Sequence, residues 1–225
     1  MIGLNSKLTL FFLALLFAFT TGAQPIRFSL ASDGSAEHSF KKGQRYWAYG
    51  QTVCGQFHIT PTDALYAWLA YYGDGKFKND LTATAKSPTT NPQTVNYRNN
   101  ARLRFKHISL GWKRYFKGDY DAEKSWNLYG YAGFGLLLGR IENSQSIPVD
   151  SAQYLLPLKN GKGNFKRLTF DVGSGVEFPA GASVFLYLEA RALIPTTDYP
   201  SPYLFVNRKA PLVGAANLGI RILIN

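Results

Sequence analysis

Between residues 168 and 194, apolar side chains occupy every second position, and the positions between them hold small or charged residues. A period of two is that of a β-strand, since successive side chains point to opposite faces. Each apolar stripe runs for roughly 10 residues, about the length that a tilted strand needs to cross a bilayer core. The opposite face carries Asp171, Glu177, Glu189 and Arg191, which soluble proteins seldom bury without partners. Strands that are apolar outside and polar inside are typical of a transmembrane β-barrel.

The same alternation predicts eight strands, at residues 25–32, 45–59, 64–72, 102–116, 125–140, 168–178, 184–194 and 213–224. In the fourth of these, the apolar residues Leu103 and Phe105 are at odd-numbered positions, whereas Ile108 and Leu110 are at even-numbered positions. The two pairs would therefore point to opposite faces of a regular strand, that is, they differ in parity. A β-bulge near His107 reconciles the two, because one extra residue reverses the facing. The predicted fold class is all-β, an eight-stranded antiparallel up-and-down transmembrane barrel.

The predicted connections alternate between long and short. The long ones are residues 33–44, 73–100, 141–164 and 195–211, and short turns follow the second, fourth and sixth strands. Barrels of this class have short periplasmic turns and longer extracellular loops, and an even strand number leaves both termini in the periplasm. The loop lengths therefore support the barrel independently of hydropathy.

The beginning of the chain predicts export. Residues 1–23 contain one cation, Lys7, then an apolar run and small residues before Gln24, as in a cleavable signal peptide. The alternative is a membrane anchor, but the uninterrupted apolar run is shorter than the roughly 18 residues of a spanning helix. The expected organisation is a signal peptide at 1–23 and a barrel domain at 24–225. Cys54 is the single cysteine, so no internal disulfide can form.

Closing eight strands leaves an interior that side chains can fill. We expect an interior ion-pair network, formed by Asp171, Glu177, Glu189, Arg191 and Arg221. Unpaired charges there are costly, so the acids are expected to pair with the arginines. We consider Asp171 and Glu177 against Arg191, and Glu189 against Arg221, although the sequence does not fix the strand register. The network is interpreted as a structural plug, with a gated ion path as the alternative.

This architecture resembles the small OmpA/OmpX-like outer-membrane β-barrel family of Gram-negative bacteria, a porin-family-like group. The resemblance covers residues 24–225 and is clearest in residues 126–135 and 218–224. It implies an integral outer-membrane protein that the barrel-assembly machinery inserts, without a cofactor. One departure is that the family usually ends in an aromatic residue, whereas this chain ends in Ile224 and Asn225. We therefore expect no peptidoglycan-binding domain after the barrel.

The chain is basic, with 25 Lys and Arg against 14 Asp and Glu. Many cations fall in predicted outer loops or strand mouths, namely Lys41, Lys42, Arg45, Lys76, Lys78, Arg98, Arg102, Arg104, Lys162, Lys166, Arg167, Arg208 and Lys209. Cations near phosphorylated lipids gain favourable electrostatic energy, so we hypothesise that they contact lipopolysaccharide. Solvated loop charges are the alternative. A secreted chain is not expected to bind nucleic acid, and no surface ligand can be named.

The sequence offers little catalytic chemistry. The three histidines are scattered, and no pair has metal-ligand spacing. His107 and Ser109 share a strand face, as in the outward-facing His-x-Ser of lipid A deacylases, but Asp121 or Glu123 would have to orient the histidine from the opposite side of the membrane. We therefore expect no enzyme, no metal and no catalytic residue.

The leading functional interpretation is a non-enzymatic outer-membrane barrel with a role in envelope integrity or surface interaction. The second is a narrow porin-like channel, although eight strands argue against a wide pore. The third is a soluble periplasmic lipocalin-like carrier, which requires the apolar stripes to point inward and the charges at 171, 177 and 191 to face water. A lipid-modifying enzyme is the fourth.

Overall fold

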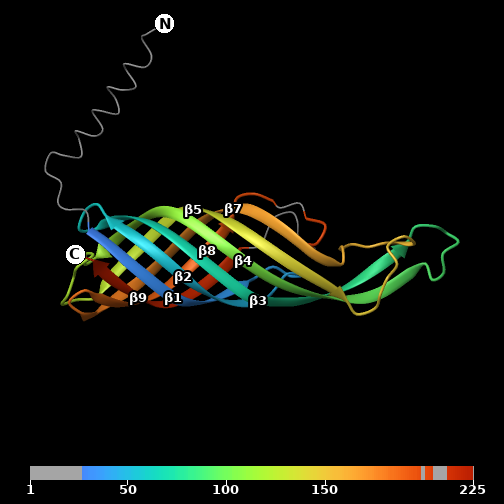
Figure 1. Ribbon diagram of the computed structural model, residues 1–225, viewed down its shortest axis with the longest axis horizontal. Coiled ribbons are helices and arrows are strands. Elements are labelled where there is room, and N and C mark those ends of the chain that lie inside the picture. The colour runs from blue at the N-terminus through green and yellow to red at the C-terminus, as the bar shows by residue number, and fades with distance from the viewer. Residues whose placement is uncertain (1–26, 199–200, 205–211, 225) are drawn as a thin grey trace, which may run out of the picture.

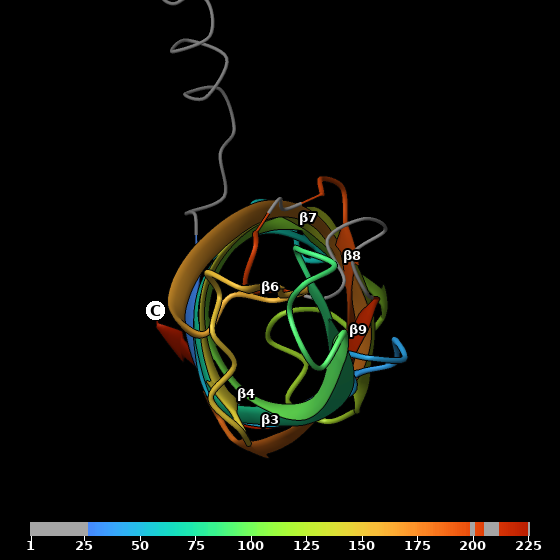
Figure 2. The same cartoon turned by 90° about the vertical axis from the view of Figure 1, so that its right-hand side faces the viewer.

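Eight long antiparallel strands close into a single cylinder (Figures 1 and 2). The computed structural model describes residues 27–198, 201–204 and 212–224. Its strands are β1 (Arg27–Ser39), β2 (Trp47–His58), β3 (Asp63–Ala85), β4 (Thr94–Lys117), β5 (Asn127–Gln145), β6 (Tyr154–Leu155), β7 (Gly161–Gly181), β8 (Val184–Pro195) and β9 (Val213–Ile224). Pairing of β1 with β9 and of β2 with β3 completes the ring, while the two-residue β6 only adds to the end of β3. The predicted fold class is confirmed.

Side chains along each barrel strand alternate between a buried and an exposed position. On β8 the exposed positions are Leu186 and Leu188, and the buried positions between and beside them are Phe185, Tyr187 and Glu189. A carrier with its apolar stripes inward would show the reverse, so the lipocalin-like alternative is wrong. An apolar belt therefore surrounds the cylinder, as a barrel in a lipid bilayer requires.

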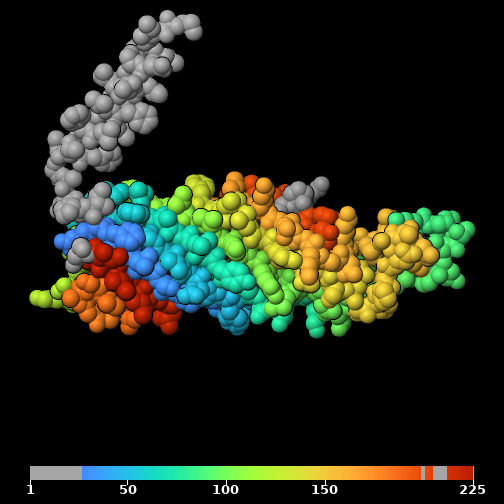
Figure 3. Space-filling view, viewed as in Figure 1, coloured from blue at the N-terminus to red at the C-terminus, as the bar shows by residue number. Residues whose placement is uncertain are grey.

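The two ends of the cylinder differ (Figure 1). At the terminal end, β1 begins beside the end of β9, with Phe28 opposite Ile224, and the connections 59–62, 118–126 and 182–183 are short. The connections at the loop end are 40–46, 86–93, 146–160 (which includes β6) and 196–212, and β3 and β4 continue well past the cylinder (Figure 3). Only the last two of these connections are longer than every connection at the terminal end, so the predicted alternation of long and short connections is confirmed in part.

Several strands are longer than the sequence predicts. β1 continues to Ser39, so residues 33–39 belong to the barrel wall and not to a loop. β3 and β4 pair as far as Thr84 opposite Thr94, so most of the expected loop 73–100 is a hairpin. On β3 and β4 the apolar pattern ends sooner than the strands because paired backbone continues where the outer faces meet water.

The bulge expected near His107 is absent. β4 pairs with β5 continuously from Asn99 to Tyr115, and Leu103 and Phe105 are buried inside the barrel, on the same face as His107. The change of apolar parity therefore marks a change of environment: toward the loop end the outward positions are polar and the interior is apolar. The register shifts of β4 and β3 lie elsewhere, at Tyr115/Lys117 and at Tyr72/Gly75.

An apolar cluster fills the barrel toward its loop end. It includes Leu103, Leu137, Ile141 and Leu193 from three strands. Leu204, from the connection between β8 and β9, is 1% exposed and packs into the same cluster. This packing closes the loop end of the lumen, whereas charged residues gather toward the terminal end.

Candidate functional site

The five interior charges predicted from the sequence all point into the cylinder. Asp171 and Glu177 come from β7, Glu189 and Arg191 from β8, and Arg221 from β9, and each is at most 8% exposed. The alternation of each strand places them there, because neighbouring positions face outward. Their pairing differs from the combinations that the sequence suggested.

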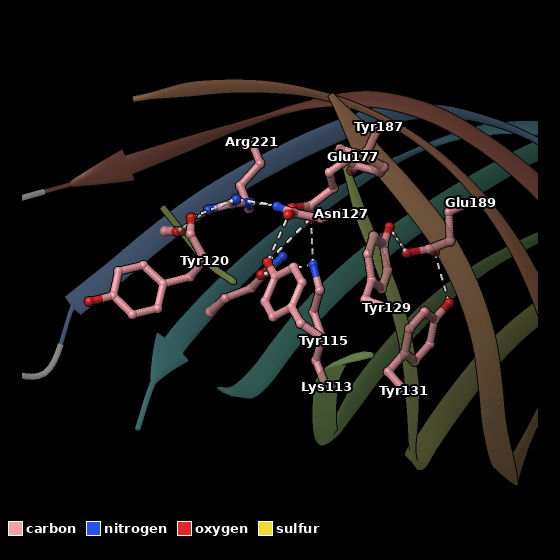
Figure 4. Close-up of polar contacts among 12 residues, drawn as sticks. Lys113, Tyr115, Tyr120, Asn127, Tyr129, Tyr131, Glu177, Tyr187, Glu189 and Arg221 are labelled. Atoms are coloured by element: carbon pink, nitrogen blue, oxygen red, sulfur yellow. Dashed lines mark hydrogen bonds and ion pairs between the residues drawn. The ribbon is translucent and has the colours of Figure 1, made fainter. Parts of the chain in front are cut away.

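Glu177 holds the first cluster, near the terminal end (Figure 4). Its Oε1 lies 2.6 Å from Lys113 Nζ, and its Oε2 lies 2.9 Å from an Arg221 guanidinium nitrogen. The Tyr115 hydroxyl donates to Oε2 at 3.2 Å, and Lys113 Nζ also donates to Gln56 Oε1 at 3.3 Å. One carboxylate thus faces two buried cations, and the side chains come from opposite walls of the barrel. Arg221 pairs with Glu177, and not with Glu189 as considered.

Glu189 holds the second cluster, one layer further along the barrel (Figure 4). Its carboxylate accepts from Arg191 at 2.9 Å, from the hydroxyl groups of Tyr131 at 2.8 Å and Tyr129 at 3.0 Å, and from Asn217 at 2.8 Å. Arg191 therefore pairs with its own strand neighbour, and not with Asp171 or Glu177. The Glu189 carboxylate is thus fully hydrogen-bonded within the protein, whereas Arg191 Nη1 and Asn217 Oδ1 are buried without a hydrogen-bond partner.

Asp171 faces a partner that the sequence did not single out. Its Oδ2 lies 3.3 Å from His107 Nε2, and this nitrogen is 2.8 Å from Thr169 Oγ1. Both the carboxylate and the imidazole are shielded from solvent. Each acid of β7 therefore contacts β4, which lies beyond β5 in the sheet.

Two interior acids and two interior cations were not identified as interior residues. Asp33 accepts a 2.8 Å hydrogen bond from the Tyr187 hydroxyl, and Glu37 accepts one of 3.2 Å from Tyr46. Both lie on β1, where small outward residues leave only a weak apolar stripe. Arg167 on β7 is one missed cation. Lys113 is the other, and it shares the inward face of β4 with His107. Parity relative to the apolar stripe is the signal that could have identified it.

Two small cavities lie among the described interior residues. A cavity of about 30 Å³ lies between Cys54, Tyr66 and Glu189, and one of about 20 Å³ lies between Tyr46, Leu103 and Leu193. Each volume accommodates about one water molecule. The side chains therefore leave no wide aqueous path through the part of the lumen that the structure describes.

The His-x-Ser pair does not face lipid. His107 and Ser109 are both buried inside the barrel, and Ser109 donates to the carbonyl of Phe134 at 3.3 Å. Asp121 instead lies 3.4 Å from Arg27 at the terminal end. The outward-facing arrangement considered for a deacylase is therefore wrong. The described residues contain no group of three or more His, Cys, Asp or Glu that could hold a metal ion.

The cations proposed to contact lipopolysaccharide fall into three groups. Exposed or half-buried around the loop end are Lys41, Lys42, Arg45, Lys76, Lys78, Arg98, Arg102, Arg104, Lys162 and Lys166. Arg167 is 5% exposed and points into the barrel, so it is removed from this set. Arg208 and Lys209 lie outside the described residues, as do the signal peptide 1–23 and the first two residues of the predicted first strand.

Some exposed cations at the loop end are already neutralised. Arg102 is hydrogen-bonded to Asp74, Arg98 to Asp80 at 2.8 Å, and Lys162 lies 3.4 Å from Glu142. The hydrogen bond from Arg102 lowers the pKa of Asp74, so this acid stays ionised and offsets its neighbour. These pairs leave less charge for an external anion than the sequence alone suggests.

Comparison with known proteins supports the fold. No protein-family model matches the chain, and no curated protein is found as a relative by sequence. Among solved structures, Ail of Yersinia pestis, crystallised with the heparin analogue sucrose octasulfate, has a TM-score of 0.50 and 9% identity, covering 89% of this chain and 100% of Ail. Neisserial surface protein A has a TM-score of 0.49 and 14% identity, covering 87% of this chain and 96% of that protein. The barrel domain of Pseudomonas aeruginosa OprF has a TM-score of 0.47 and 12% identity, covering 87% of this chain and 97% of that domain.

Proposed function

We propose that this chain is a non-enzymatic outer-membrane barrel whose loop end serves surface interaction or envelope integrity, with its exposed cations contacting lipopolysaccharide. The observation that carries the proposal is the combination of a filled lumen with a long ordered hairpin at the loop end. The fold, which it shares with Ail, supports the membrane location.

The outer surface of the cylinder fits a bilayer. Leu110, Phe134, Leu188 and Leu218 on four strands are each more than half exposed in the isolated chain. Contiguous exposed apolar surface of this kind indicates contact with lipid or another apolar partner. No helix among the described residues is long and apolar enough to span a membrane.

A channel function is disfavoured by the interior. The clusters of Glu177 and Glu189 span the lumen, and the apolar cluster with Leu204 follows them toward the loop end. Moving an ion through would require these pairs to separate in a low-dielectric interior, which costs several kcal/mol per unpaired charge. This supports a closed barrel over the porin-like alternative.

The β3–β4 hairpin is the best candidate for the interacting surface. From Gly75 opposite Leu103 to Thr84 opposite Thr94 it remains paired, and it continues past the end of the β2–β3 ladder at Gly73 and of the β4–β5 ladder at Asn99. Leu81 and Tyr97 pack with Tyr154 and Leu158, so a small apolar cluster of its own holds it. Ordering an extension costs conformational entropy at every residue, and a flexible loop would connect the strands equally well. An ordered extension therefore favours a recognition role.

Topology on intact cells tests the proposal. The native thiol is removed by Cys54→Ser, and single cysteines are introduced by Thr89→Cys at the hairpin tip and by Ala182→Cys in the β7–β8 turn. We expect a membrane-impermeant maleimide to label the hairpin variant on intact cells and the turn variant only after lysis. Labelling of both variants on intact cells, or of neither until lysis, would contradict it.

A second experiment addresses lipopolysaccharide. Detergent-extracted wild-type protein is expected to retain more lipopolysaccharide than a charge-reversal variant carrying Lys41→Glu, Lys42→Glu and Arg45→Glu, because like charges repel the lipid phosphates. Equal retention by the two proteins counts against the contact at these positions.

A further inference from the structure

A groove on the outside of the barrel lies over β4, β5 and β7, where the apolar belt ends. It has a volume of about 560 Å³, and its lining includes Tyr71, Arg104, Lys106, Leu138, Arg140 and Lys166. Lys106 and Arg140 were not among the cations singled out from the sequence. The groove is separate from the interior clusters, because its charged side chains project outward.

Strand register shows how abruptly the surface changes. Ile108, Leu136 and Leu168 pair side by side and form the last fully apolar row across the three strands. In the next row Lys106 and Lys166 flank Leu138. A charged row directly beside an apolar one is the surface that a lipid headgroup and its acyl chains together would meet.

The following row sets two arginines against each other. Arg104 on β4 is directly opposite Arg140 on β5, and both are exposed. Like charges directly opposite on neighbouring strands destabilise a sheet. An anion bound between them would remove that repulsion, and phosphate oxygens are strong acceptors for guanidinium groups.

The groove cations also lack the acids that neutralise their neighbours. All 14 Asp and Glu residues belong to the described part of the chain, and none forms a salt bridge with Arg104, Lys106, Arg140 or Lys166 there. One row further out, Arg102 and Lys162 do have acidic partners. The four groove cations therefore remain available to an external anion, as do Lys42, Arg45, Lys76 and Lys78 elsewhere at the loop end.

The opposite side of the barrel has a different outer rim. There the exposed aromatic side chains Phe40, Trp47 and Tyr49 are accompanied by the cations Lys42 and Arg45. Aromatic side chains suit the interface without selecting a charged group. The groove differs from that rim because its cations lie on adjacent paired strands, as Arg104 opposite Arg140 does.

We propose that this groove binds the phosphorylated headgroup of an outer-leaflet lipid, with Lys106 and Arg140 as its main phosphate contacts. The acyl chains then lie along the apolar row of Ile108, Leu136 and Leu168. The assignment rests on the proposed outer-membrane function and makes it specific, because it selects one site among the many cations of the loop end.

The test compares two charge-matched double variants. Lys106→Gln with Arg140→Gln neutralises the groove, and Lys42→Gln with Arg45→Gln removes the same two residue types outside it. Heat-modifiable gel migration first verifies that each protein is folded. Native mass spectrometry in detergent then measures binding of bisphosphorylated lipid A and of its dephosphorylated form.

Wild-type protein is expected to prefer the bisphosphorylated lipid, and the groove variant to bind it roughly tenfold more weakly and lose the preference. The matched variant should weaken binding by no more than about threefold, because Lys42 and Arg45 belong to the diffuse lipopolysaccharide contact of the loop end and not to the groove. Equal weakening of both variants overturns the groove while leaving a diffuse lipopolysaccharide contact intact. Absence of any phosphate preference in wild type overturns the groove and that contact together.

A sulfated saccharide is the competing occupant. Sucrose octasulfate serves as the probe, because it is a soluble polyanion. Binding of sucrose octasulfate that disappears in the groove variant, together with unchanged lipid A binding, would overturn the lipid assignment. Lipid A binding that is lost in the groove variant and is not displaced by sucrose octasulfate supports it.

Discussion

The carboxylate of Glu177 lies 2.9 Å from the guanidinium group of Arg221, and both side chains are at most 1% exposed. The two residues lie on β7 and β9, strands that are separated by β8 in the sheet. The same carboxylate also receives Lys113 from β4, so it ties together strands from different parts of the ring. Glu177 is therefore expected to be the interior residue on which the terminal end of the barrel depends most.

Replacing Glu177 by Gln should destabilise the barrel strongly. The substitution keeps the shape but leaves Lys113 and Arg221 as buried cations without a counter-charge, a change that typically costs about 3–5 kcal/mol. Reversible urea unfolding in lipid vesicles, followed by tryptophan fluorescence, measures the change.

Glu142→Gln is the matched control. It removes the same charge from an exposed pair with Lys162, and we expect a cost below about 1 kcal/mol. Similar unfolding midpoints for the two variants would show that the Glu177 cluster is not a stabilising centre.

Glycine at 173 makes room for an interior ring. A Cβ built there would lie 2.4 Å from the Cζ atom of Tyr131, whose hydroxyl donates to Glu189. Gly173→Ala should therefore lower the free energy of unfolding by about 1–3 kcal/mol, because the ring must move away from its partner. Gly34→Ala is the control, since nothing lies within 4 Å of that added methyl group. An equal loss in both variants would contradict the packing explanation.

Planar bilayer recordings of the wild-type protein should show no steady ion current. The ion-paired clusters and the apolar cluster occupy successive layers of the lumen, and the cavities that remain hold about one water molecule each. An unrelated outer-membrane porin with a wide, water-filled pore provides the positive control. Sustained, ohmic conductance of the folded protein would restore the porin-like interpretation.

Asp63 should titrate below its ordinary pKa of 3.8. The indole of Trp112 donates to its carboxylate at 2.9 Å, and this hydrogen bond is the largest cause of the lowered pKa. Because the pKa of Asp63 is lower in the folded than in the unfolded protein, its ionised carboxylate stabilises the β2–β3 turn at any pH above the pKa of the unfolded state. This stabilisation is lost as the pH falls through the pKa of the folded state. Carboxyl carbon NMR measures the titration, and Trp112→Phe should move it back toward 3.8. An unchanged titration in that variant contradicts the assignment.

The sequence predicts the membrane-facing wall well. At Leu186, Leu188 and Glu189 the alternation is clear, because one face meets hydrocarbon and the other a crowded polar lumen. Residues 33–39 were missed because the outward positions Ser32, Gly34 and Ala36 are small, and so give almost no hydropathy contrast.

The prediction of a loop at 73–100 and the prediction of a bulge in β4 are wrong for a related reason. Beyond the belt the outward positions become polar, as at Lys76 and Lys78, while Phe77 and Leu81 are buried. The period of two continues, but its apolar parity reverses with the surroundings. A prediction that assumes lipid outside every strand interprets that reversal as a loop or a bulge.

The ion-pair partners could not be predicted from the pattern. Lys113 and Glu177 are 64 residues apart, and their strands are not neighbours in the sheet. Their meeting depends on the register of every intervening pair and on the closure of the ring. The groove likewise depends on register, because it brings Arg104, Arg140 and Lys166 together from three strands.

Orientation of the barrel wall is the central claim, and spin-label accessibility measures it most directly. In a Cys54→Ser background, nitroxide labels are placed by Leu188→Cys and Leu218→Cys on the belt and by Thr89→Cys at the hairpin tip, and the protein is folded into vesicles. Relaxation by membrane-dissolved oxygen should dominate at 188 and 218, and relaxation by a water-soluble nickel chelate should dominate at 89. Preferential relaxation of the labels at 188 and 218 by the nickel chelate would contradict a lipid-facing belt.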